Sequence, residues 1–75
     1  MSDFPARLRK LRESQRPVRS MMVTSQLMGL SSDALRRYER GEREPGLREL
    51  KLIADYYSIS LDELCWGEGE KEENL

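Results

Sequence analysis

The sequence predicts an all-α domain of five helices, and two observations indicate it. Apolar residues recur at spacings of three and four in several stretches, which is the pattern of helices with one buried face. No stretch shows the alternation of apolar and polar residues typical of a strand. The chain has 75 residues, so we expect one small domain, residues 1–67, followed by an acidic, disordered tail, residues 68–75.

The first predicted helix covers residues 4–14. Asp3 stands at the position of an N-cap, and Pro5 is tolerated in a first helical turn. The inward face carries apolar residues at helical spacing: Phe4, Leu8 and Leu11. Basic residues are expected around the outside: Arg7, Arg9 and Lys10. Arg12 follows Leu8 by four residues, so it also points inward and needs an anionic partner there.

The second predicted helix follows a loop at residues 15–19, where Pro17 prevents a simple continuation of the first helix. Ser20 is its expected N-cap. The helix then covers residues 21–28 and ends at Gly29, a residue type that favours the left-handed conformation found after many helices.

The third predicted helix runs from Ser32 to Arg40, with Ser31 as its N-cap and Gly41 as its stop. At about 100° per residue, its apolar side chains gather on one side: Leu35 and Tyr38, with Ala34 at the edge. Charged side chains gather on the opposite side: Asp33, Arg36, Arg37 and Arg40. One face is therefore suited to burial, and the other presents guanidinium groups outward, as a helix in the major groove of DNA requires.

The fourth and fifth predicted helices close the domain. The fourth begins at Leu47 and carries an apolar stripe at helical spacing: Leu47, Leu50, Ile53, Ala54 and Tyr57. Residues 58–60 interrupt it. Ser60 then caps a short last helix, residues 61–64, with Glu63 in the capping-box position three residues on.

The distribution of charge matters more than the total. The formal net charge is only −1, but residues 1–43 hold ten Arg or Lys against five Asp or Glu, whereas residues 44–75 hold three against nine. The first part is therefore basic by five charges and the second acidic by six. Such asymmetry is typical of a polyanion-binding region beside an acidic segment.

The composition argues against several other classes of protein. Without His there is no imidazole base, and a single Cys offers neither an internal disulfide nor a thiolate cluster, so we expect no enzyme, no cofactor and no metal site. No apolar run approaches the about 18 residues of a membrane span, and no signal-peptide pattern is seen, so we expect a soluble, cytoplasmic protein.

The order of these features resembles a known family. The stretch from Ser20 to Tyr38, with the following Glu-Arg-Gly-Glu-Arg-Glu-Pro, is similar to the helix-turn-helix of the phage-repressor and Cro-type family, the lambda-repressor-like DNA-binding domains. Arg7-Leu8-x-x-Leu11-Arg12 resembles its first helix, and Leu50-x-x-Ile53-Ala54 with Ser60-Leu61-Asp62-Glu63-Leu64 its last two. The likeness covers residues 4–67 and implies a compact five-helix fold in which the second and third helices read DNA.

The resemblance also implies roles for individual residues. Ser31 matches the family's cap on the recognition helix, and three residues match positions that face base edges, with Arg36 beside them: Ser32, Asp33 and Arg37. Arg40 matches a phosphate-contacting position, and Arg43 lies near the DNA backbone in relatives. Glu39 matches a residue that pairs with a first-helix arginine, here Arg12. The partner implied is double-stranded DNA with a palindromic operator, bound by a homodimer of a phage- or prophage-type repressor.

Two departures from the family pattern keep a second function open. Met21 replaces the usual Gln at the start of the second helix, and a thioether cannot donate a hydrogen bond to the DNA backbone. Thr24 replaces a large aliphatic residue. With the acidic second half, the departure at Met21 favours a protein-interaction module of antitoxin or anti-repressor type.

Two further assignments have alternatives. The pairs that Asp33 forms with Arg36 and Arg37 have the i, i+3 and i, i+4 spacing of ordinary solvated salt bridges on a helix, which need no DNA to explain them. A dimer surface is expected after the last helix, at residues that would otherwise stay partly exposed: Leu64, Cys65 and Trp66.

Overall fold

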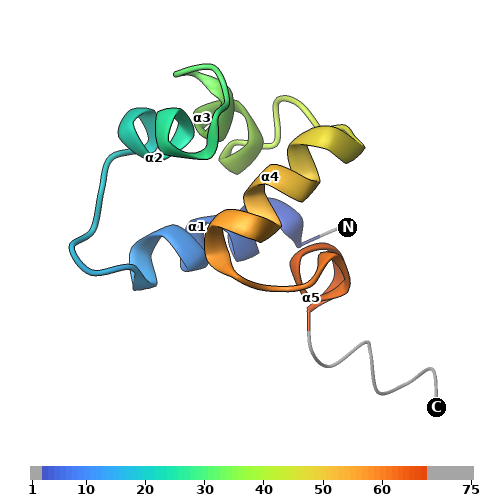
Figure 1. Ribbon diagram of the computed structural model, residues 1–75. Helices are drawn as coiled ribbons and strands as arrows, with labels where there is room; N and C mark the ends of the chain where they lie inside the picture. Colours follow the sequence, from blue (N-terminus) through green and yellow to red (C-terminus); the bar gives the residue numbers. More distant parts are fainter. Residues whose placement is uncertain (1–2, 68–75) are drawn as a thin grey trace, which may run out of the picture.

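The computed structural model describes residues 3–67, and this part of the chain contains helices and no strand (Figure 1). The helices are α1 Phe4–Ser14, α2 Met21–Met28, α3 Ala34–Glu39, α4 Leu47–Tyr57 and α5 Leu61–Trp66. The predicted all-α, five-helix fold is confirmed. The tail predicted for residues 68–75 lies outside the described residues.

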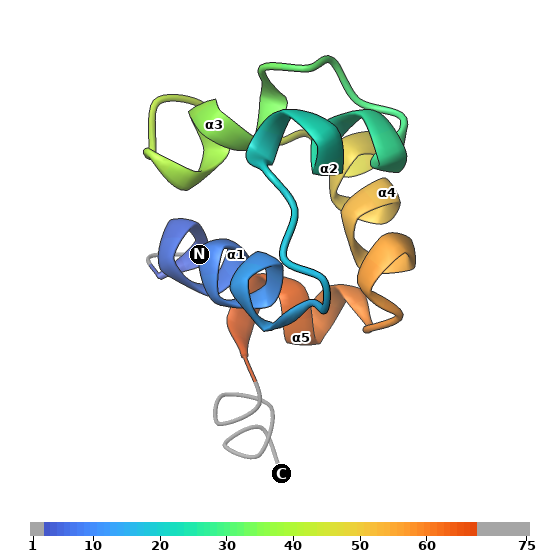
Figure 2. The ribbon, with the colours of Figure 1, turned by 90° about the vertical axis from the view of Figure 1, so that its left-hand side faces the viewer.

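The helices form two groups, which are joined by α4 and by direct packing of α1 against α3. In Figures 1 and 2, α2 and α3 lie at one end of the molecule and α1 and α5 at the other, with α4 along the side between them. α1 packs against α3 and α5, and α4 against α2 and α5. Four helices each place one fully buried side chain in the shared core: Leu8, Leu35, Ile53 and Leu64. α3 is therefore fixed by the core on one side only.

The first helix has the predicted bounds but differs in two side chains. Asp3 makes no capping hydrogen bond, because its backbone (φ −100°, ψ 16°) lacks the extended conformation of a capping residue. Arg7, expected on the outside, is half-buried. Its Nη1 donates to the carbonyl oxygens of Leu64 and Cys65, both at 3.1 Å. These carbonyls lie in the last turn of α5, where intrahelical donors are lacking, so Arg7 ties α1 to α5.

The second helix begins and ends as predicted. The Ser20 side chain accepts a hydrogen bond from the Val23 N–H at 3.1 Å, and Gly29 has a φ of 86°. Thr24, which stands at the family's aliphatic position, is buried, and its hydroxyl donates to the Ser20 carbonyl oxygen at 2.8 Å. The hydroxyl thus has a hydrogen-bond partner within its own helix, so Thr24 can be buried in place of an aliphatic residue.

The last two helices correct the sequence interpretation at three positions. Leu47 is 63% exposed, because it lies in the first turn of α4, beyond the stretch of that helix that packs on the core. The Ser60–Glu63 capping box is present, but α5 extends to Trp66, two residues further than predicted. Leu64 is fully buried and so cannot belong to a dimer surface, whereas Trp66 is 48% exposed.

The Tyr57 hydroxyl is buried and has no hydrogen-bond partner among the described residues. Burial raises the pKa of Tyr57 to about 12, because the phenolate is not solvated there. The favourable contribution of the neutral phenol is therefore complete below pH 10, the ordinary value, and is lost as the pH rises through about 12.

We expect Tyr57→Phe to leave the free energy of unfolding unchanged or to raise it by about 1 kcal/mol, since it removes an unsatisfied polar group without changing the ring. The variant should also lose stability less steeply between pH 10 and 12. Urea unfolding at pH 7 and at alkaline pH measures both effects. Destabilisation of more than about 1 kcal/mol at pH 7 would mean that the hydroxyl has a partner.

Candidate nucleic-acid interface

The interface predicted around α3 begins with a turn, not with a helical residue. Residues 32 and 33 form a turn closed by the Ala34 N–H, which donates to the Ser31 carbonyl oxygen at 3.0 Å. The helix starts at Ala34, so the predicted start at Ser32 and the predicted N-cap at Ser31 are both wrong. Asp33 occupies the N-cap position with helical backbone angles and makes no capping hydrogen bond, since its carboxylate faces the arginines that follow.

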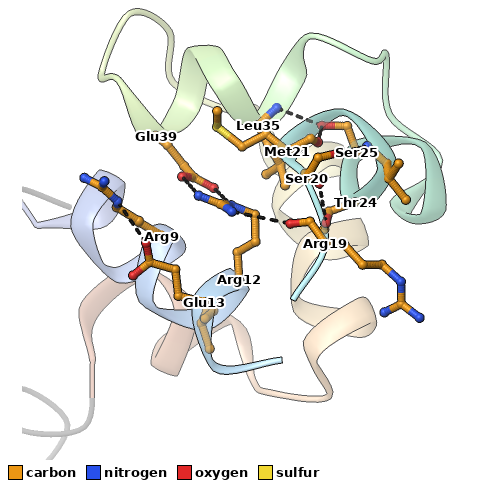
Figure 3. Close-up of polar contacts among 12 residues, drawn as sticks. Arg9, Arg12, Glu13, Arg19, Ser20, Met21, Thr24, Ser25, Leu35 and Glu39 are labelled. Atoms are coloured by element: carbon orange, nitrogen blue, oxygen red, sulfur yellow. Dashed lines mark hydrogen bonds and ion pairs between the residues drawn. The ribbon is translucent and has the colours of Figure 1, made fainter. Parts of the chain in front are cut away.

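A residue of α2 supplies the missing cap. The Ser25 hydroxyl, fully buried, accepts a hydrogen bond from the Leu35 N–H at 3.0 Å and donates to the Met21 carbonyl oxygen at 2.8 Å (Figure 3). It therefore satisfies one of the free N–H groups in the first turn of α3. The sequence interpretation missed this contact because the two residues are ten positions apart and belong to different helices.

The far end of α3 is fixed to α1 by a bidentate ion pair. Arg12 donates from Nε and Nη2 to the two carboxylate oxygens of Glu39, at 2.8 and 2.9 Å (Figure 3). The side chains are 13% and 5% exposed, and the pair holds the pKa of Arg12 above its ordinary value. Arg12 Nη1 also donates to the Arg19 carbonyl oxygen at 3.4 Å, which links the loop before α2 to the same cluster.

The outward face of α3 carries a second, solvent-exposed cluster. Asp33 Oδ1 accepts from Arg36 Nε at 2.8 Å, and Oδ2 accepts from Arg36 Nη2 at 3.0 Å and from Arg37 Nε at 2.8 Å. These bonds to Arg36 and Arg37 lower the pKa of Asp33 to about 2, so the carboxylate is ionised at neutral pH. One carboxylate thus orders both guanidinium groups.

The remaining predicted site residues surround this cluster. Arg40, the C-cap of α3, pairs with Glu42 at 2.9 Å, and both side chains are exposed. All predicted DNA-contacting residues except the half-buried Asp33 are exposed: Ser31, Ser32, Arg36, Arg37, Arg40 and Arg43. They lie on or beside one helix, at the surface opposite the core.

A concavity of about 430 Å³ lies between the start of α3 and the start of α4. Arg37 and Arg43 line it, and so does Arg48, which the sequence interpretation missed. Arg48 belongs to the first turn of α4. It lies in the part of the sequence that is acidic overall, so the distribution of charge does not predict a DNA-binding role for it. Three arginines from separate elements therefore line one hollow together with two carboxylates, Asp33 and Glu49, so its lining is basic by one charge.

Within residues 3–67, no group of three or more His, Cys, Asp or Glu side chains could hold a metal ion. None of the helices in that range is long and apolar enough to cross a membrane.

Comparisons with known proteins agree with this geometry. A family model described as helix-turn-helix matches residues 24–64, more than half of the chain. The HTH-type transcriptional regulator AnsR of Bacillus subtilis is 34% identical over 53 residues, which cover 71% of this chain and 46% of that protein. The cryptic phage CTXphi transcriptional repressor RstR of Vibrio cholerae is 42% identical over 48 residues, 61% of this chain and 43% of that protein.

The chain thus aligns with less than half the length of both relatives. No solved structure gives a significant match. The matched region contains Ser25, all of α3 and the concavity beside it.

Proposed function

Because this chain belongs to the helix-turn-helix family of phage-repressor and Cro type, we propose that it regulates transcription by binding double-stranded DNA in a sequence-dependent way. The observation that carries the proposal is the two-sided build of α3. Its inner side is fixed by the core, by Ser25 and by the Arg12–Glu39 pair, while its outer side displays exposed arginines. A rigid helix with outward guanidinium groups is what reading of the major groove requires.

We propose two kinds of DNA contact. Ser32 and Arg37, with Arg36 beside them, face base edges, where guanidinium groups donate two hydrogen bonds to a guanine, and Asp33 pairs with both arginines there. Arg40 and Arg43 contact phosphates, which gives affinity without sequence information. This division follows from position, since the first group lies at or near the start of α3 and the second at its end and in the loop beyond.

The start of α2 contributes less to docking than in relatives. Met21 is partly buried and packs against the core, and its side chain has no hydrogen-bond donor to offer a phosphate. We propose that the arginines beside α3, including Arg48 of the concavity, supply the backbone contacts instead. Affinity should then depend strongly on salt, because each arginine that neutralises a phosphate releases counterions.

Replacing two arginines one at a time separates base readout from phosphate contact. Arg37→Ala should relax sequence preference by about 1–3 kcal/mol at one base pair, whereas Arg40→Ala should weaken binding to all duplexes by a similar factor. The measurement is equilibrium binding of each variant to a consensus duplex, chosen by selection from random sequences, and to its single-base variants. Equal, sequence-independent losses from both changes would remove Arg37 from the set of base-reading residues.

The biological setting is proposed from the relatives. One of them is named as a cryptic phage transcriptional repressor, which supports a repressor of phage or prophage type. A protein that binds DNA in this way would act in the cytoplasm. We propose a homodimer on a palindromic operator, with half-sites about one helical turn apart. Cys65 and Trp66 remain as candidates for its contact surface, since both keep some exposure while Leu64 does not. Binding of this kind needs no catalytic group, cofactor or metal.

One observation favours the alternative of a protein-interaction module. The outer face of α2 carries no charge and exposes three apolar side chains: Met22 at 54%, Val23 at 38% and Leu27 at 54%. Such a face is suited to a protein partner. If binding of a protein partner were the main activity, replacing all three residues by Gln would abolish that binding. DNA binding, measured separately, would stay unchanged.

A further inference from the structure

Both oxygens of the Asp33 carboxylate already accept hydrogen bonds from arginines. Oδ1 accepts from Arg36, and Oδ2 accepts from both Arg36 and Arg37, all at 2.8–3.0 Å. These charge-assisted bonds hold the carboxylate against two guanidinium groups, so its main interactions are with the arginines of its own helix. The family resemblance places Asp33 among the residues that face base edges, whereas its hydrogen bonds indicate that it holds the two arginines in place.

The two arginines are held in different ways. Arg36 uses Nε and Nη2 together, so the carboxylate occupies one whole side of its guanidinium group. Arg37 uses only Nε, and its Nη1 and Nη2 make no hydrogen bond to any of residues 3–67. The end of the Arg37 guanidinium therefore keeps two parallel N–H donors, the arrangement that matches O6 and N7 of guanine.

The position of Arg37 also distinguishes it from Arg36 as the arginine that is free to bind a base. Arg37 and Asp33 both line the concavity beside α3, together with Arg43 and Arg48, whereas Arg36 does not. The hollow has one more arginine than carboxylate in its lining, and Asp33 holds the Arg37 guanidinium group at its edge through Nε. An unheld arginine side chain loses more conformational entropy on binding, so a fixed one binds its base with less cost.

We infer that Asp33 is a positioning residue that directs Arg37 onto a guanine, and that it does not itself contact a base. The inference rests on the proposed DNA binding and names the base read and the residue that sets the preference. Loss of the carboxylate should then act on the same base pair as loss of Arg37. If Asp33 instead bound a cytosine directly, its loss would act independently of Arg37, and the effects of the two losses would add.

The test compares Asp33→Ala, Arg37→Ala and the double variant on every single-base variant of the selected duplex. We expect Arg37→Ala to lower the preference for guanine at one base pair by about 5- to 150-fold. Asp33→Ala should lower the preference at the same base pair by a smaller factor, and the double variant should lower it no further than Arg37→Ala does. Glu42→Ala is the matched control, because it removes another exposed carboxylate paired with an arginine, Arg40. It should raise affinity for all duplexes by a similar factor and leave preferences unchanged.

The outcomes separate the two levels of the proposal. A wild-type protein that selects no consensus would overturn the proposed function and this inference together. A clear consensus with Asp33→Ala acting at another base pair, additively with Arg37→Ala, or at none, would overturn the inference alone. Circular dichroism of Asp33→Ala should match the wild type, because the Asp33 side chain does not cap α3.

Discussion

Replacing Glu39 by alanine is expected to lower the free energy of unfolding by about 3–5 kcal/mol, the usual cost of leaving one member of a buried ion pair alone. Arg12 would keep its charge in a site where it is 13% exposed, and two hydrogen bonds of 2.8 and 2.9 Å would be lost. The total free energy of unfolding of a small domain is about 5–15 kcal/mol, so the loss should be large when stability is measured by urea or thermal unfolding.

A double variant controls for this prediction. Arg12→Met with Glu39→Leu removes both charges and fills similar volume with apolar groups, so it should recover most of the stability lost in Glu39→Ala. Recovery would show that apolar groups of similar volume can replace the ion pair. A loss below about 1 kcal/mol in Glu39→Ala would place the pair among ordinary surface salt bridges.

Ser25→Ala is expected to destabilise the domain by about 1–3 kcal/mol, because the Leu35 N–H would be buried without an acceptor. The start of α3 has no other side-chain cap, so the same change should loosen the turn at Ser31 and Ser32. Hydrogen exchange at the Leu35 amide, together with urea unfolding, measures the two consequences.

Thr24→Val is the matched control for Ser25→Ala. Thr24 is equally buried, but its hydroxyl donates only to a carbonyl of its own helix that also accepts the Thr24 N–H. Its removal should change stability by less than about 1 kcal/mol. Equal effects of the two changes, or an unchanged Leu35 amide in Ser25→Ala, would contradict the assignment of Ser25 as the cap of α3.

Local patterns predicted the helices well because their causes are local. Ser20, Gly29 and the Ser60–Glu63 pair act within a few residues of themselves, and each has the predicted role. The inward direction of Arg12 followed from its spacing to Leu8, and its partner from the family resemblance. The helical spacing of apolar residues does not show where a helix extends beyond the core. For this reason the sequence wrongly predicts that Leu47 is buried and that Leu64 is exposed.

The candidate site was predicted less completely because its important contacts join separate elements. The cap that Ser25 gives to α3, and the presence of Arg48 and Arg37 in one concavity, depend on how α2, α3 and α4 pack together. The spacing of Asp33 predicts that it pairs with both arginines. Only distances between atoms distinguish a residue that contacts a base from one that positions a base-contacting arginine.

The central claim is that α3 reads DNA, and its most direct test is titration of the wild-type protein with the selected duplex and a scrambled duplex over a salt series. We predict binding to both at low salt, a steep fall in affinity as salt rises, and a preference for the selected duplex of at least about 10³ at physiological salt. Undetectable binding to either duplex at low salt, or equal affinity for the two at every salt concentration, would contradict it.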